Sequence, residues 1–247
     1  MKRIVVPTAS GSDWKRLLGK PDLHWKPGKS AMSAAASWEA AGNHLPAELD
    51  AALGASRDPD LAGLNLLLAV PEWEVELPGG LTTSHSDVLA LARNDHGLVV
   101  VAVEAKVDEQ FGPTLGEKRS DPSEGQSNRL TYLHGVLQLD APLPDSIRYQ
   151  LLHRTVSSIL TARLFHAHVA VMLVQSFSPV GRWREEFDVF CRALGVVPTS
   201  DRVAAVPGHE KPRLFVGWCT GDQRFREVDL RGAGRVESRR GDVRAGE

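Results

Sequence analysis

The sequence has few cysteines, little net charge and no long apolar run. Its two cysteines, Cys191 and Cys219, are too few for a disulfide framework or a zinc cluster, so we expect reduced thiols in a cytoplasmic protein. No apolar segment reaches the length of a transmembrane helix, and residues 1–7 are too short for a signal peptide, so no membrane partner is expected. The net charge of −2 does not indicate nucleic-acid binding by overall charge, so a polyanion site requires a local basic patch.

The chain is long enough to bury one substantial hydrophobic core. It has 247 residues, of which 42% are hydrophobic, and this suits one large domain, which we place at residues 1–230. Residues 231–247 are rich in Gly and Arg and poor in apolar side chains, a composition that predicts a disordered tail.

Residues 98–106 predict the strand at the centre of the fold. Its first six residues are apolar without alternation and rich in β-branched side chains, which is typical of a strand covered on both faces. The strand then ends in Glu104 and Lys106, which lie on the same face because side chains alternate along a strand. Buried charges are costly unless they are paired, hydrated or bound to a ligand, so this end of the strand is a candidate site.

A second strand at residues 86–93 precedes a turn at residues 94–97, which has the composition of a hairpin turn. A symmetric hairpin places Asp87 directly opposite Glu104, with Lys106 two residues further along the same face. Cross-strand neighbours have Cβ atoms roughly 4.5–5.5 Å apart, so the two carboxylates would repel each other. A divalent cation bound between them is the simplest remedy.

The remaining pattern predicts helices on both sides of this hairpin. Helices are expected at residues 12–19, 30–42, 46–53, 129–139, 147–165 and 183–194, and strands at 72–77, 168–174 and 213–218. Residues 61–70 are apolar but of ambiguous type, and the polar residues 112–128 are expected to form a solvated loop or a flexible lid. This order predicts an α/β fold, in which a mixed central sheet contains a β-meander and is flanked by helices.

The same order, with Asp87 on the second strand of the meander and Glu104-x-Lys106 on the third, resembles the PD-(D/E)XK nuclease superfamily. The resemblance covers residues 30–176, which would form a restriction-endonuclease-like core. Residues 103–113 and 148–155 are similar to segments of an uncharacterised bacterial family within that superfamily. Ser86 stands where the proline that names the superfamily is expected.

The resemblance implies a metal-dependent nuclease that hydrolyses phosphodiester bonds in DNA or RNA. Its catalytic residues would be Asp87, Glu104 and Lys106, with Glu39 and Gln150 on the flanking helices as further candidates. Asp87 and Glu104 would hold Mg²⁺, for which Mn²⁺ can substitute, and Lys106 would orient the attacking water or stabilise the transition state. Gln150 and Arg154, one turn apart on a helix, would position the substrate phosphate.

Other interpretations of the same residues remain open. Asp87, Glu104 and Lys106 could form a structural ion-pair cluster, because a fold does not by itself fix an activity. The leading alternative is a catalytically inactive nuclease-fold module that binds nucleic acid or a protein partner. The sequence leaves open the strandedness of a substrate and the oligomeric state, with a homodimer among the options.

Overall fold

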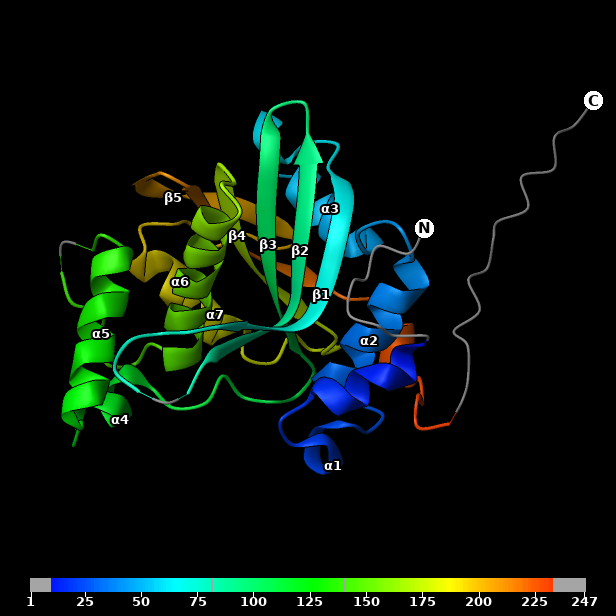
Figure 1. The fold of residues 1–247 in the computed structure, drawn as a ribbon, viewed down its shortest axis with the longest axis horizontal. Coiled ribbons are helices and arrows are strands. Elements are labelled where there is room, and N and C mark those ends of the chain that lie inside the picture. The colour runs from blue at the N-terminus through cyan, green and yellow to red at the C-terminus, as the bar shows by residue number, and fades with distance from the viewer. Residues whose placement is uncertain (1–9, 81, 140, 233–247) are drawn as a thin grey trace, which may run out of the picture.

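The structure is a computed structural model that describes residues 10–80, 82–139 and 141–232, and it contains a six-stranded mixed sheet with helices on both faces (Figure 1). The strands are β1 (Asn65–Val75), β2 (Ser84–Asn94), β3 (Gly97–Lys106), β4 (Val169–Ser176), β5 (Arg202–Glu210) and β6 (Arg213–Thr220). The α-helices are α1 (Pro21–His24), α2 (Ser30–Ala41), α3 (Ala47–Gly54), α4 (Leu115–Arg119), α5 (Glu124–Val136), α6 (Tyr149–Leu164) and α7 (Arg184–Ala193). Short 3₁₀ segments are η1 (Gly11–Leu17), η2 (Pro59–Leu61) and η3 (Gln223–Arg226).

The strand order is β1-β2-β3-β4-β6-β5. The first three strands form an antiparallel meander, β4 and β6 run parallel to β3, and β5 returns antiparallel to β6. The α/β class with a mixed, helix-flanked sheet that contains a meander is therefore confirmed. None of the helices in the described ranges is long and apolar enough to cross a membrane.

The strand β3 is buried on both faces, as its unbroken apolar run predicts. Val99, Val101 and Val103 pack into the core beneath α2 and α3, whereas Val100 packs into the core beneath α5, α6 and α7. Ala34, Ala35 and Ala36 of α2 are almost fully buried, and such small side chains allow a helix axis to approach the sheet closely. The two helical layers therefore exclude water from β3 along most of its length.

The hairpin between β2 and β3 has the predicted register. Val88 pairs with Val103 and Asn94 pairs with Gly97, so the turn lies where the sequence places it. A two-residue connection fixes the register of its strands, which explains why this part of the sheet follows from the sequence.

The structure resolves one ambiguous segment, corrects one expectation and adds one strand. Residues 65–70, of ambiguous type, begin the strand β1, which also contains Pro71, tolerated because β1 is an edge strand. The segment 112–128 is not a simple loop, because α4 begins in it at a capping box formed by Thr114 and Glu117, and α5 begins at Glu124. The edge strand β5 was not predicted. Most of the predicted disordered tail, residues 233–247, lies outside the described residues.

Candidate functional site

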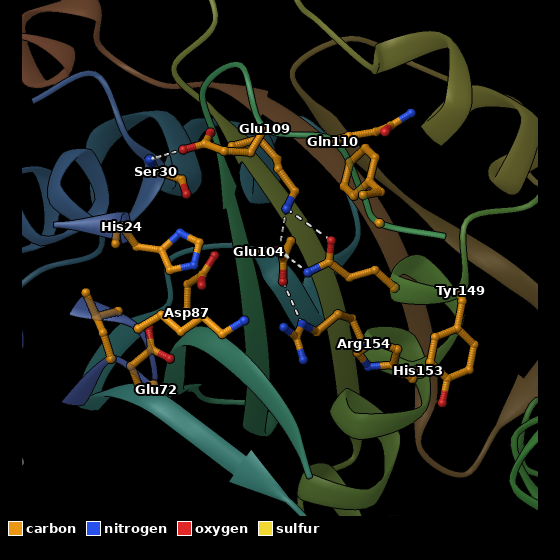
Figure 2. A pocket seen from close by; sticks show the side chains of 18 of the residues that line it. His24, Ser30, Glu72, Asp87, Glu104, Glu109, Gln110, Tyr149, His153 and Arg154 are labelled. Carbon is orange, nitrogen blue, oxygen red and sulfur yellow. Dashed lines mark hydrogen bonds and ion pairs between the residues drawn. The ribbon is translucent and has the colours of Figure 1, made fainter. Parts of the chain in front are cut away.

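The charged ends of the meander strands open into a pocket of about 490 Å³. One wall is the chain between η1 and α2, a second wall is the loop that follows β3, and the third is the first two turns of α6 (Figure 2). The polar side chains on its floor and walls include Glu72, Asp87, Glu104, Lys106, Glu109, Gln150, His153 and Arg154.

Three neighbouring strands each contribute a carboxylate to this pocket. In the β1–β2 ladder Pro71 pairs with Val88 and Trp73 pairs with Ser86, so Glu72 lies opposite Asp87. The β2–β3 ladder ends at the pair Val88–Val103, and extending its register by one residue sets Asp87 opposite Glu104. The Asp87 carboxylate accepts a hydrogen bond of 2.6 Å from the backbone N–H of Ala105, which fixes its orientation at the end of the ladder.

The Glu104 carboxylate is the centre of a buried polar network. Its Oε1 accepts hydrogen bonds of 2.8 Å from both Lys106 Nζ and Gln150 Nε2, and its Oε2 accepts one of 2.6 Å from Arg154 Nε. Lys106 also donates to Gln150 Oε1 at 3.1 Å. Burial alone would raise the pKa of Glu104, but the charges and hydrogen bonds of Lys106 and Arg154 outweigh burial and lower it. Glu104 is therefore held as a charged carboxylate.

Glu72 and Asp87 have the opposite electrostatic character. Burial, reinforced by the charge of Glu104, raises the pKa of Asp87 to about 7. Burial, reinforced by Asp87 and Glu104, raises the pKa of Glu72 to about 9. Within the described ranges no Lys or Arg side chain lies within ion-pair distance of either carboxylate, whereas Glu104 has two. Glu72 therefore holds a proton at neutral pH, and Asp87 titrates near neutral pH, unless a further positive charge lies beside them.

The structure brings most of the predicted site residues together. Asp87, Glu104, Lys106, Gln150 and Arg154 all line the pocket. Arg154, predicted to bind substrate phosphate, instead donates to Glu104 and, through Nη1, to Ser84 Oγ at 2.9 Å. Its guanidinium is thus already engaged on the protein side of the pocket.

Glu39 does not reach this site, which corrects its assignment as a catalytic candidate. The part of α2 that lines the pocket is its first turn, at Ser30 and Ala31. Glu39 lies eight residues further along the helix than Ala31, about 12 Å away at the usual helical rise. Its carboxylate accepts a hydrogen bond of 2.9 Å from Trp14 Nε1, which indicates a role in attaching η1 to α2.

Glu72 and His153 are among the pocket residues that the sequence did not assign to the site. Glu72 has a φ of 49°, an uncommon backbone conformation for a residue other than glycine. The connection between β1 and β2 is too long to define their register, so the sequence could not place Glu72 opposite Asp87. His153 lies at 2.8 Å from Ser84 Oγ and packs against the ring of Tyr149. Burial, together with the charge of Arg154, lowers the pKa of His153 well below 6.5, so its imidazole is neutral.

The donor atoms of the pocket fit a hard divalent cation in part. In the described ranges no group of three or more His, Cys, Asp and Glu side chains is arranged to hold a metal ion. A physical reason is that both oxygens of Glu104 already accept hydrogen bonds. Glu72 and Asp87, by contrast, have no Lys or Arg within ion-pair distance in the described ranges, and their raised pKa values mean that a divalent cation would take the place of their protons. Mg²⁺ binds through one or two protein carboxylates and keeps several waters, so these two groups suit it.

Comparisons with known proteins identify the family of this chain. No curated protein matches the chain. No solved structure matches it either. A family model described as a domain of unknown function (DUF6946) matches residues 7–223, which is most of the chain, and the protein belongs to that family.

Proposed function

We propose that this protein is a cytoplasmic, PD-(D/E)XK-like nuclease that hydrolyses phosphodiester bonds in DNA or RNA with Mg²⁺, for which Mn²⁺ can substitute. The observation that carries the proposal is that Asp87, Glu104 and Lys106 line one pocket at the ends of two neighbouring strands. The free, buried thiols of Cys191 and Cys219 agree with a reducing compartment.

Each residue of the pocket has a role in this proposal. Asp87 and Glu72 would hold the cation, with Glu104 as a further ligand once one of its hydrogen bonds is exchanged. A bound Mg²⁺ would lower the pKa of a coordinated water and stabilise the charge that develops on the phosphate. Lys106, held at 2.8 Å from Glu104 and 3.1 Å from Gln150, would orient the attacking water or donate to the phosphate.

One observation favours a second candidate function, a catalytically inactive nuclease-fold module that binds nucleic acid or a protein partner. The Glu104 carboxylate is already satisfied by Lys106, Gln150 and Arg154, so this network can exist without a metal ion. A catalytically inactive protein with this fold would be expected to keep such a network, because the network satisfies its own buried charges.

Calorimetric titration of Mn²⁺ distinguishes the two candidates without a choice of substrate. The wild type is compared with Asp87→Asn and Glu104→Gln, and with Asp50→Asn as a matched control, because Asp50 is exposed on α3 and does not line the pocket. We expect Mn²⁺ to bind the wild type and the control, and to bind both pocket variants far more weakly. Nucleic acid is then incubated with the same four proteins and Mn²⁺.

Cleavage by the wild type and the control, and its loss in both pocket variants, would support the nuclease. Nucleic-acid binding without cleavage, combined with no Mn²⁺ binding in the presence of the bound strand, would contradict the nuclease and favour the inactive module. Equal cleavage by all four proteins would indicate a contaminating nuclease and would contradict the proposed site.

A further inference from the structure

The segment of residues 10–29, which we name the flap, concentrates positive charge beside the pocket. It carries Lys15, Arg16, Lys20, Lys26 and Lys29. Its acidic residues are only Asp13 and Asp22. Because the whole chain has a net charge of −2, the flap is a local basic region on a protein that is otherwise slightly acidic.

The flap is anchored to the domain by two buried tryptophans. Trp14 is 4% exposed and donates to Glu39, and Trp25 is 3% exposed. The backbone N–H of Gly28 donates to the carbonyl of Arg226 at 2.8 Å. The lysines of the flap are therefore presented from a fixed surface, and their phosphate contacts would not require a chain segment to become ordered.

The flap forms the wall of the pocket nearest to Asp87 and Glu72. Lys20 and His24 line the pocket, and Ser30, the first residue of α2, continues the same wall (Figure 2). Lys20 is exposed, and in the described part of the chain no carboxylate lies within ion-pair distance of its ammonium. A cation in this position can contact an anionic group that enters the pocket.

Two further lysines of the flap are exposed and do not line the pocket. Lys26 is exposed and, within the described ranges, has no carboxylate within ion-pair distance. Lys15 lies 3.8 Å from Asp22, but both side chains are largely exposed, and ion pairs of this kind contribute little. Lys15 and Lys26 therefore remain available to a polyanion.

We infer that the flap is the surface that binds the sugar–phosphate backbone of a nucleic-acid strand, and that Lys20 contacts a phosphate at the mouth of the pocket. Lys15 and Lys26 contact phosphates further along the strand. The identity of the ligand rests on the proposed function, because a phosphodiester in the pocket must continue as a strand on either side. The contacts are to phosphate, so they provide affinity without base specificity.

Fluorescence anisotropy with a labelled DNA hairpin that carries a single-stranded tail tests this inference, because the probe offers both kinds of strand. The flap variant is Lys15→Ala/Lys20→Ala/Lys26→Ala. The matched control is Arg163→Ala/Arg192→Ala/Lys211→Ala, which removes the same charge from exposed positions outside the pocket. Affinity is measured without divalent metal over a series of salt concentrations, and circular dichroism verifies that all three proteins are folded.

We expect the flap variant to bind more weakly than the wild type and the control. The slope of log affinity against log salt should become shallower by about 2 to 3, since each of the three lost phosphate contacts contributes roughly 0.7 to 0.9. Equal affinities and slopes for the flap variant and the control would overturn the inference, as would an absence of binding to the wild type at low salt.

Vesicles of phosphatidylserine and phosphatidylcholine form a second arm of the experiment. Binding to vesicles that depends on the same lysines, without binding to the hairpin, would also overturn the inference and would favour a lipid surface. Mn²⁺ titration of the flap variant separates this outcome from a failure of the proposed function. If the flap variant binds Mn²⁺ as the wild type does, the metal site is intact. A loss of nucleic-acid binding, or its absence, then concerns the flap alone, and the nuclease proposal is judged by the experiment described for it.

Discussion

The substitution Asp87→Asn should stabilise the metal-free protein at alkaline pH, although it alters a predicted catalytic residue. Asparagine has nearly the same shape as aspartate, and its side-chain oxygen can still accept the hydrogen bond from the Ala105 N–H. What the substitution removes is a negative charge that is buried next to Glu72 and Glu104.

The size of the effect follows from the pKa of Asp87. Its value in the folded protein is about 7, against an ordinary value of 3.8. At roughly 1.4 kcal/mol per pKa unit, ionising this group in the folded protein costs on the order of 4 kcal/mol. Because neighbouring groups adjust their own protonation, we expect Asp87→Asn to raise the free energy of unfolding by about 2 to 4 kcal/mol at pH 8.

The sign of the pH dependence is defined by the same pKa. Between pH 3.8 and 7 the folded state holds the Asp87 proton and the unfolded state has lost it, so stability decreases as the pH rises through this range. Asp87→Asn removes this contribution to the decrease. The variant and the wild type should therefore be similar in stability near pH 4 and diverge towards pH 8.

Urea denaturation in the presence of EDTA at pH 4, 6 and 8 measures this difference, with Asp50→Asn as the matched control. Addition of Mn²⁺ at one hundred times its dissociation constant should then stabilise the wild type by about 2.7 kcal/mol and leave Asp87→Asn unchanged. A variant that is less stable than the wild type at pH 8 would refute the uncompensated charge on which the metal site depends.

Three further substitutions test other parts of the site. Lys106→Met should abolish cleavage while retaining Mn²⁺ binding, and should lower the free energy of unfolding by about 1 to 3 kcal/mol, because Glu104 loses a hydrogen-bonded cation. A cleavage assay, calorimetry and urea denaturation measure these three effects. Unchanged cleavage would show that Lys106 takes no part in the chemistry. Glu39→Gln should change neither Mn²⁺ affinity nor cleavage rate, since Glu39 contacts Trp14 outside the pocket; a large loss of either would restore Glu39 to the site. For His153, the unfolded state binds a proton below pH 6.5 that the folded state excludes, so stability falls with decreasing pH in that range. Urea denaturation from pH 6.5 to 5 should show that His153→Gln reduces this pH dependence of the free energy of unfolding by up to about 1.4 kcal/mol per pH unit. Identical slopes for the variant and the wild type would show that His153 is not the responsible group.

The parts of the site that sequence reasoning placed correctly depend on short connections. The tight turn between β2 and β3 fixes their register, so the sequence alone assigns Asp87 to the strand position opposite Glu104. Gln150 and Arg154 follow from helical spacing, because residues four apart lie on one face of α6. Glu72 could not be placed, since the long connection between β1 and β2 allows several registers that put it on either face of the sheet.

The missed strand β5 has a different physical origin. It is an edge strand in which exposed and buried residues do not alternate regularly, and Pro207 and Gly208 interrupt it. Its pairing with β6 is irregular between Ala205 and Glu210. Hydrophobic periodicity is the main signal for a strand, and here the tertiary pairing with β6 decides the conformation instead.

Asp87 has two separate roles, because its side chain accepts a hydrogen bond from the Ala105 N–H and also carries a charge. The β2–β3 ladder ends at the pair Val88–Val103, so Ala105 has no partner on β2, and the Asp87 carboxylate accepts the hydrogen bond that a main-chain carbonyl would otherwise accept. The side chain at position 87 therefore links β2 to β3 just beyond the end of their ladder, in addition to carrying charge. Among relatives of this chain, asparagine at this position would indicate a protein that has kept the hydrogen bond between the two strands and lost the charge. Alanine would leave a buried N–H unpaired, and would require a compensating change in β2 or β3.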